Sequence, residues 1–286
     1  MSIRKLTHIG AIAVGASVFA FLGSGFTAVG GQQGVGGRGN AHHFGAAQPG
    51  GLLTAPLGET KPDLADNTSK IVSTNWAGYA VTATGTRFQS IEATFFVPYV
   101  DCASTPDSFS GHWVGIDGVS DPTAEQDGIL AACQGTKPTY SAWYEMFPEP
   151  PVYSDIHIET GNSVTVSVTF NTHSAEYTLR LTDTTNGQHF SVTGACPSGV
   201  SCQRASAEAI SEAPSSDGAL LPLANFRSVD FLGITVASQG SHDGGLRSHW
   251  WRTLSITTLN SGGHILDQPT SVYHGTAFST YWMRQK

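Results

Sequence analysis

Short runs of alternating apolar and polar residues recur along the chain, and they constrain its fold more than any other feature. Residues 164–170 and 177–182 each place an apolar side chain at every second position, which is the two-residue period of a half-buried strand. Asn186-Gly187 follows the second run, and this dipeptide favours a two-residue hairpin turn. Further strand candidates are residues 91–97, 112–116, 140–147, 189–192, 205–211, 229–236, 251–257 and 278–283.

Helical periodicity is absent from the sequence, apart from a short helical turn expected near residues 123–129. Ten or more closely spaced strands in one domain predict two packed antiparallel sheets or a barrel. An all-β domain is therefore expected, most simply a sandwich of two antiparallel sheets.

Composition divides the chain into three segments. Residues 1–30 have the pattern of a secretory signal peptide, because Arg4 and Lys5 precede a short apolar run that ends in small residues. A signal anchor is the alternative, but glycines interrupt the apolar run and no second span follows. Residues 31–70 are rich in Gly, Ala, Pro and Gln and predict a propeptide or flexible linker. Residues 71–286 are then expected to form one folded domain with a large core.

Charge is sparse and mostly negative. Only 13% of residues are Asp, Glu, Lys or Arg, and the formal net charge is −8. Such a surface repels nucleic acid and anionic membranes, so neither nucleic acid nor a stable membrane association is expected. A fold with few ionised carboxylates has few of them to lose in acid, which suits work at low pH.

The four cysteines are expected to form disulfides if the chain is exported. Four cysteines allow three pairings. The pairs Cys102–Cys133 and Cys196–Cys202 are favoured because each closes a local loop between strand candidates. No thiol nucleophile then remains.

Several catalytic motifs are missing from the sequence. It lacks Gly-x-Ser-x-Gly, the Asp-Thr-Gly of pepsin-like proteases and His-Glu-x-x-His, and its histidines do not cluster at metal spacing. No metal or cofactor is therefore expected. What remains is carboxylates and amides on aromatic strands. Glu208 and Glu212 share one strand face, and a carboxylate on a crowded sheet face is costly unless it is paired or functional.

Four motifs in order resemble the glutamic peptidase family, the eqolisins. They are Trp-Val-Gly-Ile-Asp-Gly at 113–118, Glu-Gln-x-Gly at 125–128, Ala-Trp-Tyr-Glu-x-x-Pro at 142–148 and Ser-Ala-Glu-x-Ile-x-Glu-Ala-Pro at 206–214. The resemblance extends from about residue 75 to 236. It implies a sandwich of two antiparallel sheets, of concanavalin-like or jelly-roll type, and a secreted, acid-active endopeptidase that hydrolyses proteins or peptides as a monomer.

The resemblance also implies site residues. By motif position, the catalytic Gln of the family falls on Gln126 and the catalytic Glu on Glu208. Trp113, Asp117 and Glu145 fall on residues that line or support the family's site. Two positions depart from the family pattern: Ala209 stands where Trp is usual, and Asp127 where Thr is common.

One carboxylate and one amide can hydrolyse a peptide bond. Glu208 would take a proton from the attacking water and return it to the leaving nitrogen, while the Gln126 amide donates to the oxyanion. A Glu near its ordinary pKa is partly ionised in mild acid and can serve as base and then acid. Trp113 and Trp143 are candidate walls of a groove that holds an extended peptide.

Two other functions are compatible with this composition. A glycoside hydrolase would use Glu145 and Glu208 as a carboxylate pair about 5–10 Å apart, and it gives Gln126 no necessary role. A non-catalytic carbohydrate-binding sandwich would use exposed Trp and Tyr side chains instead.

Overall fold

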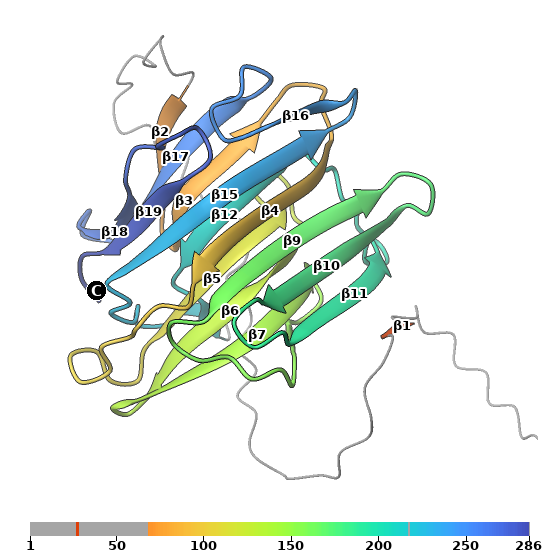
Figure 1. The fold of residues 1–286 in the computed structure, drawn as a ribbon. Helices are drawn as coiled ribbons and strands as arrows, with labels where there is room; N and C mark the ends of the chain where they lie inside the picture. The colour runs from red at the N-terminus through yellow and green to blue at the C-terminus, as the bar shows by residue number, and fades with distance from the viewer. Residues whose placement is uncertain (1–26, 29–67, 217, 286) are drawn as a thin grey trace, which may run out of the picture.

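The computed structural model describes residues 27–28, 68–216 and 218–285 (Figure 1). The elements within these residues are all β-strands, so the expected all-β class is confirmed. The predicted signal peptide lies outside the described residues, apart from residues 27–28. The predicted linker also lies outside them, apart from residues 68–70. Among the described residues, no helix is long and apolar enough to cross a membrane.

The strands vary from two to eleven residues in length. In chain order they are β1 (Thr27–Ala28), β2 (Thr68–Ser73), β3 (Trp76–Thr82), β4 (Phe88–Phe96), β5 (Phe109–Ile116), β6 (Ala124–Gln134), β7 (Lys137–Phe147), β8 (Val152–Tyr153), β9 (Ser163–Asn171), β10 (Glu176–Asp183), β11 (His189–Ala195), β12 (Ser206–Glu212), β13 (Ser215–Ser216), β14 (Ala219–Leu220), β15 (Ser228–Ser238), β16 (His242–Gly244), β17 (Arg252–Leu259), β18 (Ile265–Pro269) and β19 (Phe278–Trp282).

Two layers of strands pack against each other (Figure 1). The first, called the site sheet below, runs β2-β17-β3-β12-β5-β6-β7-β8. The second, the back sheet, runs β15-β4-β9-β10-β11. β18 pairs with β17 and β19 pairs with β18, so both strands extend the site sheet. β15 belongs to both layers, because its first residues pair with β19 and its later ones with β4. The register shifts between Leu232 and Thr235, where Gly233 has a φ of 61°, and a bulge of this kind bends a strand from one sheet to the other.

The main core lies between the two layers. Alternate residues of β9 and β10 point into it, including Val166, Val168, Leu179 and Leu181, which are all fully buried. Their partners on the other face are more exposed. The alternation that predicted these strands therefore reflects a sheet with one face on the core and one in water.

The expected helical turn at residues 123–129 is wrong. These residues enter β6, and every residue of β6 except Gln134 is buried. β6 lies at the centre of the site sheet, between β5 and β7. A strand that is covered on both faces loses the alternation of polar and apolar residues, so its sequence gives no period-two signal.

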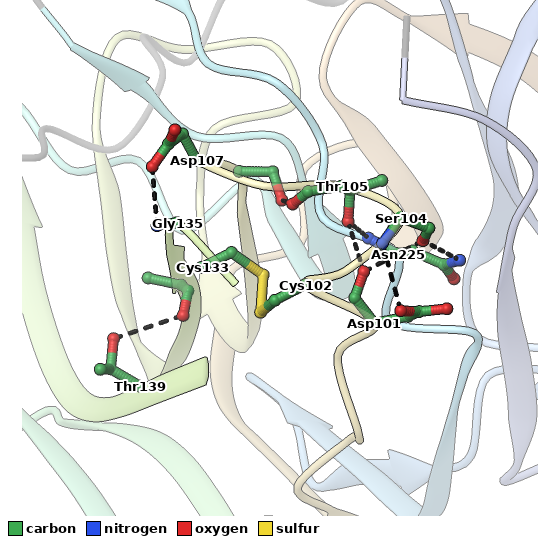
Figure 2. The surroundings of a disulfide bond; sticks show 11 residues. Asp101, Cys102, Ser104, Thr105, Asp107, Cys133, Gly135, Thr139 and Asn225 are labelled. Atoms are coloured by element: carbon green, nitrogen blue, oxygen red, sulfur yellow. Dashed lines mark hydrogen bonds between the residues drawn. A yellow bond between two sulfur atoms is a disulfide. The ribbon is translucent and has the colours of Figure 1, made fainter. Parts of the chain in front are cut away.

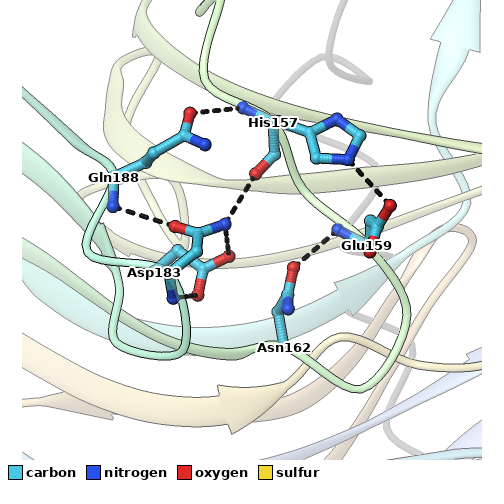
Figure 3. Close-up of polar contacts among 6 residues, drawn as sticks. His157, Glu159, Asn162, Asp183 and Gln188 are labelled. Atoms are coloured by element: carbon cyan, nitrogen blue, oxygen red, sulfur yellow. Dashed lines mark hydrogen bonds and ion pairs between the residues drawn. The ribbon is translucent and has the colours of Figure 1, made fainter.

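The hairpin between β10 and β11 forms, but its turn is wider than two residues. The amide of Asp183 donates to the carbonyl of Gln188 at 2.8 Å, which leaves four residues in the loop. The Asp183 carboxylate accepts hydrogen bonds from the amides of Thr185 and Asn186, at 2.8 and 3.2 Å. Figure 3 shows Asp183 and Gln188 beside the neighbouring loop that carries His157. The hydrogen bonds from these loop amides to the Asp183 carboxylate stabilise a four-residue turn instead of the expected two-residue turn.

Both predicted disulfides are confirmed. Cys102 is bonded to Cys133, and Cys196 to Cys202. Figure 2 shows the first bond, which ties the loop after β4 to the end of β6. Thr105 in that loop accepts a hydrogen bond from the amide of Asn225 at 2.9 Å, so the loop is also held from the other side.

Candidate active site

The strand register places three of the predicted site residues in one row across the site sheet. Glu208 on β12 lies opposite Gly115 on β5, and Gly115 lies opposite Gln126 on β6. Gln126 in turn lies opposite Glu145 on β7. Residues directly opposite each other share one face of a sheet. We call these four residues the catalytic row. Neighbouring strands are about 4.8 Å apart, so the backbones of Glu208 and Gln126 are separated by roughly 10 Å with only a glycine between them.

Gly115 allows the two side chains to approach each other. A Cβ atom at this position would lie 3.1 Å from Oε1 of Glu208 and 3.2 Å from Cβ of Gln126. It would also lie 3.0 Å from the ring of Trp113. Any side chain here would therefore have to displace the groups on both sides, which is why a glycine stands in the middle of this strand.

The Glu208 carboxyl is fully buried and lacks hydrogen bonds of normal geometry. Neither of its oxygens has a hydrogen-bond partner among the residues that the structure describes. Burial raises the pKa of Glu208 well above its usual value, the Ser206 hydroxyl opposes this shift, and the charge of Asp117 adds to it. Desolvation penalises the charged form, so the pKa of Glu208 lies above the ordinary value from which the sequence argument started. A buried, unpartnered carboxyl of this kind is typical of a reactive group.

Gln126 is held by Glu145. Its Nε2 donates a hydrogen bond to Oε2 of Glu145 at 2.5 Å, and both side chains are buried. A primary amide has two N–H donors, so one remains for another acceptor. Oε1 of Gln126 has no hydrogen-bond partner. Glu145 thus orients the amide and leaves part of its hydrogen-bonding capacity unused.

Trp113 lies under the site and is not an exposed wall. It is fully buried, and its indole N–H donates to Oε2 of Glu212 at 2.8 Å. The other Glu212 oxygen accepts from Nδ2 of Asn75 at 3.0 Å. Trp76 meets the Trp113 ring edge-on at a centroid distance of 5.0 Å. Glu212 and Asn75 therefore fix the orientation of the ring that touches Gly115.

Trp143 belongs to the same apolar cluster, which we call the aromatic floor. Gly128 separates it from Trp113 across the strands, and a Cβ at Gly128 would lie 2.6 Å from Cβ of Trp113. Only 5% of Trp143 is exposed. The buried members of the floor are Trp76, Ala80, Trp113, Leu130, Trp143, Ile210, Leu254 and Ile256.

Asp117 supports the site from the end of β5. Its carboxylate accepts hydrogen bonds from the amides of Arg204 and Ala205, at 2.7 and 2.6 Å. Burial, with a contribution from Asp121, raises the pKa of Asp117 to about 6 although these two bonds oppose the shift. Asp117 therefore anchors the start of β12, the strand that carries Glu208.

Among the described residues, no three His, Cys, Asp or Glu side chains are arranged to hold a metal ion.

The two departures from the family pattern face away from the catalytic row. Ala209 lies opposite Val114 and belongs to the core between the sheets. Asp127 is fully buried on that same side of β6, and burial raises its pKa well above the usual value, with the Ser167 backbone opposing the shift. Neither residue therefore alters the surface next to Glu208 and Gln126.

Sequence reasoning did not single out several residues of this site. Gly115 stood within a quoted motif and Asn75 at the start of the resemblance, but only the strand register and the hydrogen bonds show what they separate or hold. Asp121 accepts hydrogen bonds from the amides of Gly118 and Thr123, at 3.2 and 3.4 Å, and closes the loop after β5. The acidic loop composition was the one available signal for Asp121.

The glycosidase arrangement is not favoured by this geometry. Glu145 and Glu208 are three strands apart, and Gln126 lies between them. Glu145 is also engaged by the Gln126 amide. A carboxylate pair that acts across one glycosidic bond needs open space between its members.

Comparisons with known proteins agree with the resemblance. A model of the Peptidase A4 family matches residues 74–270. Scytalido-glutamic peptidase, solved with a transition state analog inhibitor, is 27% identical, with a TM-score of 0.63 over 73% of this chain and 98% of its own. SCP-B, a member of the Eqolisin family solved with the tripeptide Ala-Ile-His, is also 27% identical, with a TM-score of 0.60 over the same shares.

A third structure supports the fold alone. Aspergilloglutamic peptidase from Aspergillus niger is 24% identical, with a TM-score of 0.54 over 62% of this chain and 100% of its own. The sandwich architecture expected from the strand pattern is thus shared with solved glutamic peptidases. No similar sequence was found among curated proteins. The family match covers more than half of the chain, and the protein therefore belongs to the Peptidase A4 family and is a glutamic-type endopeptidase.

Proposed function

We propose that the protein is an exported, acid-active endopeptidase whose catalytic pair is Glu208 and Gln126. One observation carries this proposal. A fully buried carboxyl, without hydrogen-bond partners in the described part of the chain, lies two strands from an amide that Glu145 orients, with only Gly115 between them. All of these groups come from one chain, so we propose that the enzyme acts as a monomer.

Glu208 acts on water and Gln126 on the substrate carbonyl. The Glu208 carboxylate removes a proton from a water molecule, and the resulting hydroxide attacks the carbonyl carbon of the scissile bond. The free N–H of Gln126 donates to the oxyanion that forms. Glu208 then returns its proton to the nitrogen, and the C–N bond breaks as the carbonyl is restored. This scheme needs no metal or cofactor.

Binding of water couples the protonation of Glu208 to the reaction. Burial raises the pKa of Glu208 and so favours the neutral carboxyl. A water molecule that donates a hydrogen bond to the carboxylate favours its charged form and lowers its pKa. Glu208 can thus act as the base for the water molecule that donates to it.

The surroundings fit an extended peptide substrate. The aromatic floor runs beside the catalytic row and buries Trp113 and Trp143 at its centre. A rigid apolar floor supports a substrate without competing for the hydrogen bonds of the row. Both disulfides and the sparse charge of the chain agree with work outside the cell in acid.

The test is cleavage of a denatured protein and of a matched peptide from pH 2 to 8, with the secreted material analysed for mass and free thiols. We expect a bell-shaped profile with its maximum in acid. Maximal activity above pH 7, two reactive thiols or a mature chain that starts at Met1 would contradict the proposal.

A further inference from the structure

A pocket opens next to the catalytic row, at the end of the site sheet. Its volume is about 850 Å³. Thr82 lines it and pairs with both Ser206 and Arg252. Two residues along the same strand, Ala80 pairs with Glu208. A strand rises about 3.3 Å per residue, so the pocket begins roughly 7 Å from the row that carries Glu208.

The lining of this pocket is cationic in an acidic protein. Arg87, Arg252 and His249 line it, and no Asp or Glu is among the described residues of its lining. From residue 71 onward the chain has 19 acidic but only 9 basic residues. Two of those nine therefore meet at one cavity beside the site, without a neighbouring carboxylate in the lining to neutralise them.

Arg252 is held in place while part of its guanidinium stays free. Its Nε and Nη2 donate to the hydroxyl of Ser69 at 2.9 and 2.6 Å. A guanidinium has five N–H donors, so three remain after these two bonds. Arg252 is exposed, and by the strand register it shares a sheet face with Leu254 of the aromatic floor. Its free donors are therefore accessible from the pocket.

An aromatic surface borders the arginines. Trp250 lines the pocket and is 44% exposed. Its ring stacks on His242 at a centroid distance of 3.8 Å and an angle of 13°, which restricts its movement. An exposed indole next to two guanidinium groups suits a ligand that joins an apolar stem to a carboxylate.

We propose that this pocket binds a carboxylate of the peptide substrate, two or three residues from the scissile bond, with Arg252 and Arg87 as its recognition residues. The proposal rests on the proposed role of Glu208, because that role locates the scissile bond. An acidic side chain and a free C-terminus carry the same group. Model Asp and Glu side chains ionise near pH 4, so the preference should be present at pH 5 and weaken at pH 3.

The test is a peptide series with Glu, Gln or Ala at each position within three residues of the scissile bond, each made with a free and an amidated C-terminus. We expect the wild-type enzyme at pH 5 to cleave one Glu peptide about tenfold faster in kcat/KM than its Gln counterpart, since charge-assisted bonds are about twice as strong as neutral ones. The Glu/Gln ratio should approach 1 in Arg252→Gln and recover in part in Arg252→Lys. Arg180→Gln on the exposed face of the back sheet should leave the ratio unchanged.

Amidation identifies the source of the carboxylate. If the free form is cleaved about tenfold faster than the amidated form whichever residue is varied, the pocket binds a free C-terminus. If only the Glu position matters, it binds an acidic side chain. The proposal would be overturned by a Glu/Gln ratio near 1 together with equal cleavage of the free and amidated peptides, or by a preference that is unchanged in Arg252→Gln. Peptide binding to the Glu208→Gln variant separates the two proposals, because a Glu/Gln difference in affinity needs no catalysis.

Discussion

The two ends of β12 carry carboxyl groups in opposite circumstances. At one end Glu212 accepts hydrogen bonds from Trp113 and Asn75. At the other end Glu208 has no hydrogen-bond partner at either oxygen. Both side chains are almost completely inaccessible, with 2% and 0% exposure, and both lie on the same face of the sheet.

The difference separates a carboxyl that holds its neighbours in place from the one that we propose to be reactive. Leaving a buried polar group without a partner costs about 1–3 kcal/mol, and Glu212 avoids that cost through its two donors. Glu208 keeps its hydrogen-bonding capacity, and its missing partners lower the free energy of unfolding. Burial alone therefore does not distinguish the two carboxyls of this strand, and the missing partners of Glu208 are the reason that it, and not Glu212, is proposed to react.

Removing the acidity of Glu208 should have the largest effect. Glu208→Gln keeps the shape of the side chain but cannot exchange the proton, so we expect turnover to fall roughly 10³–10⁴-fold, the upper range for a general base. Peptide turnover and circular dichroism check this result. Near-wild-type turnover in a folded variant would exclude Glu208 as the catalytic base.

Truncating Gln126 should have the next largest effect. Gln126→Ala removes the donor proposed for the oxyanion, and loss of one such donor costs about 10²–10³ in kcat. The matched control is Gln134→Ala, at the exposed end of the same strand, which should leave kcat unchanged. A loss confined to KM would show that Gln126 binds the substrate but does not stabilise the transition state.

Raising the pH should destabilise the fold by a few kcal/mol. Burial raises the pKa of Asp267 to about 8 and that of Asp117 to about 6, so the folded chain binds more protons than the unfolded chain above about pH 4. Stability is then fully present below pH 4 and is lost as the pH rises through 6 towards 8. Urea unfolding at pH 4 and pH 7.5 measures the difference. Equal or greater stability at pH 7.5 would show that these carboxyls are not neutral in the folded state.

Asp267→Asn provides the control for this pH dependence. Asp267 is fully buried on β18, away from the catalytic row. The amide cannot ionise, so the stability of this variant should vary less with pH than that of the wild-type protein.

The back sheet was predictable from sequence, and the centre of the site sheet was not. β9 and β10 have one face on the core and one in water, so their period of two is visible in the sequence. β6 is covered on both faces, and its run of small and apolar residues around Gln126 lacks that period. The strand that carries a proposed catalytic residue was for this reason the one expected to form a helical turn.

The candidate site divides in the same way. The motifs located Glu208, Gln126 and Glu145, but they did not show which carboxyl has partners. That distinction depends on contacts between residues 99 and 137 positions apart in the chain, from Trp113 and from Asn75 to Glu212. The pKa of Glu208 also depends on burial by the surrounding strands, which local sequence does not encode.

Replacing Glu212 should have the smallest effect on activity and a measurable effect on stability. In Glu212→Gln, the amide oxygen can accept from Trp113 or from Asn75, but the amide nitrogen cannot accept from the other donor. One buried donor is left unpaired, and we expect a loss of about 1–3 kcal/mol in the free energy of unfolding. We expect less than a tenfold loss in kcat, because the Trp113 ring still packs against Trp76 and Gly115. Urea unfolding and peptide turnover, measured beside Glu208→Gln, give the comparison directly. If Glu212→Gln abolished turnover without loss of stability, the proposed assignment would be contradicted, and Glu212 would be the reactive carboxyl.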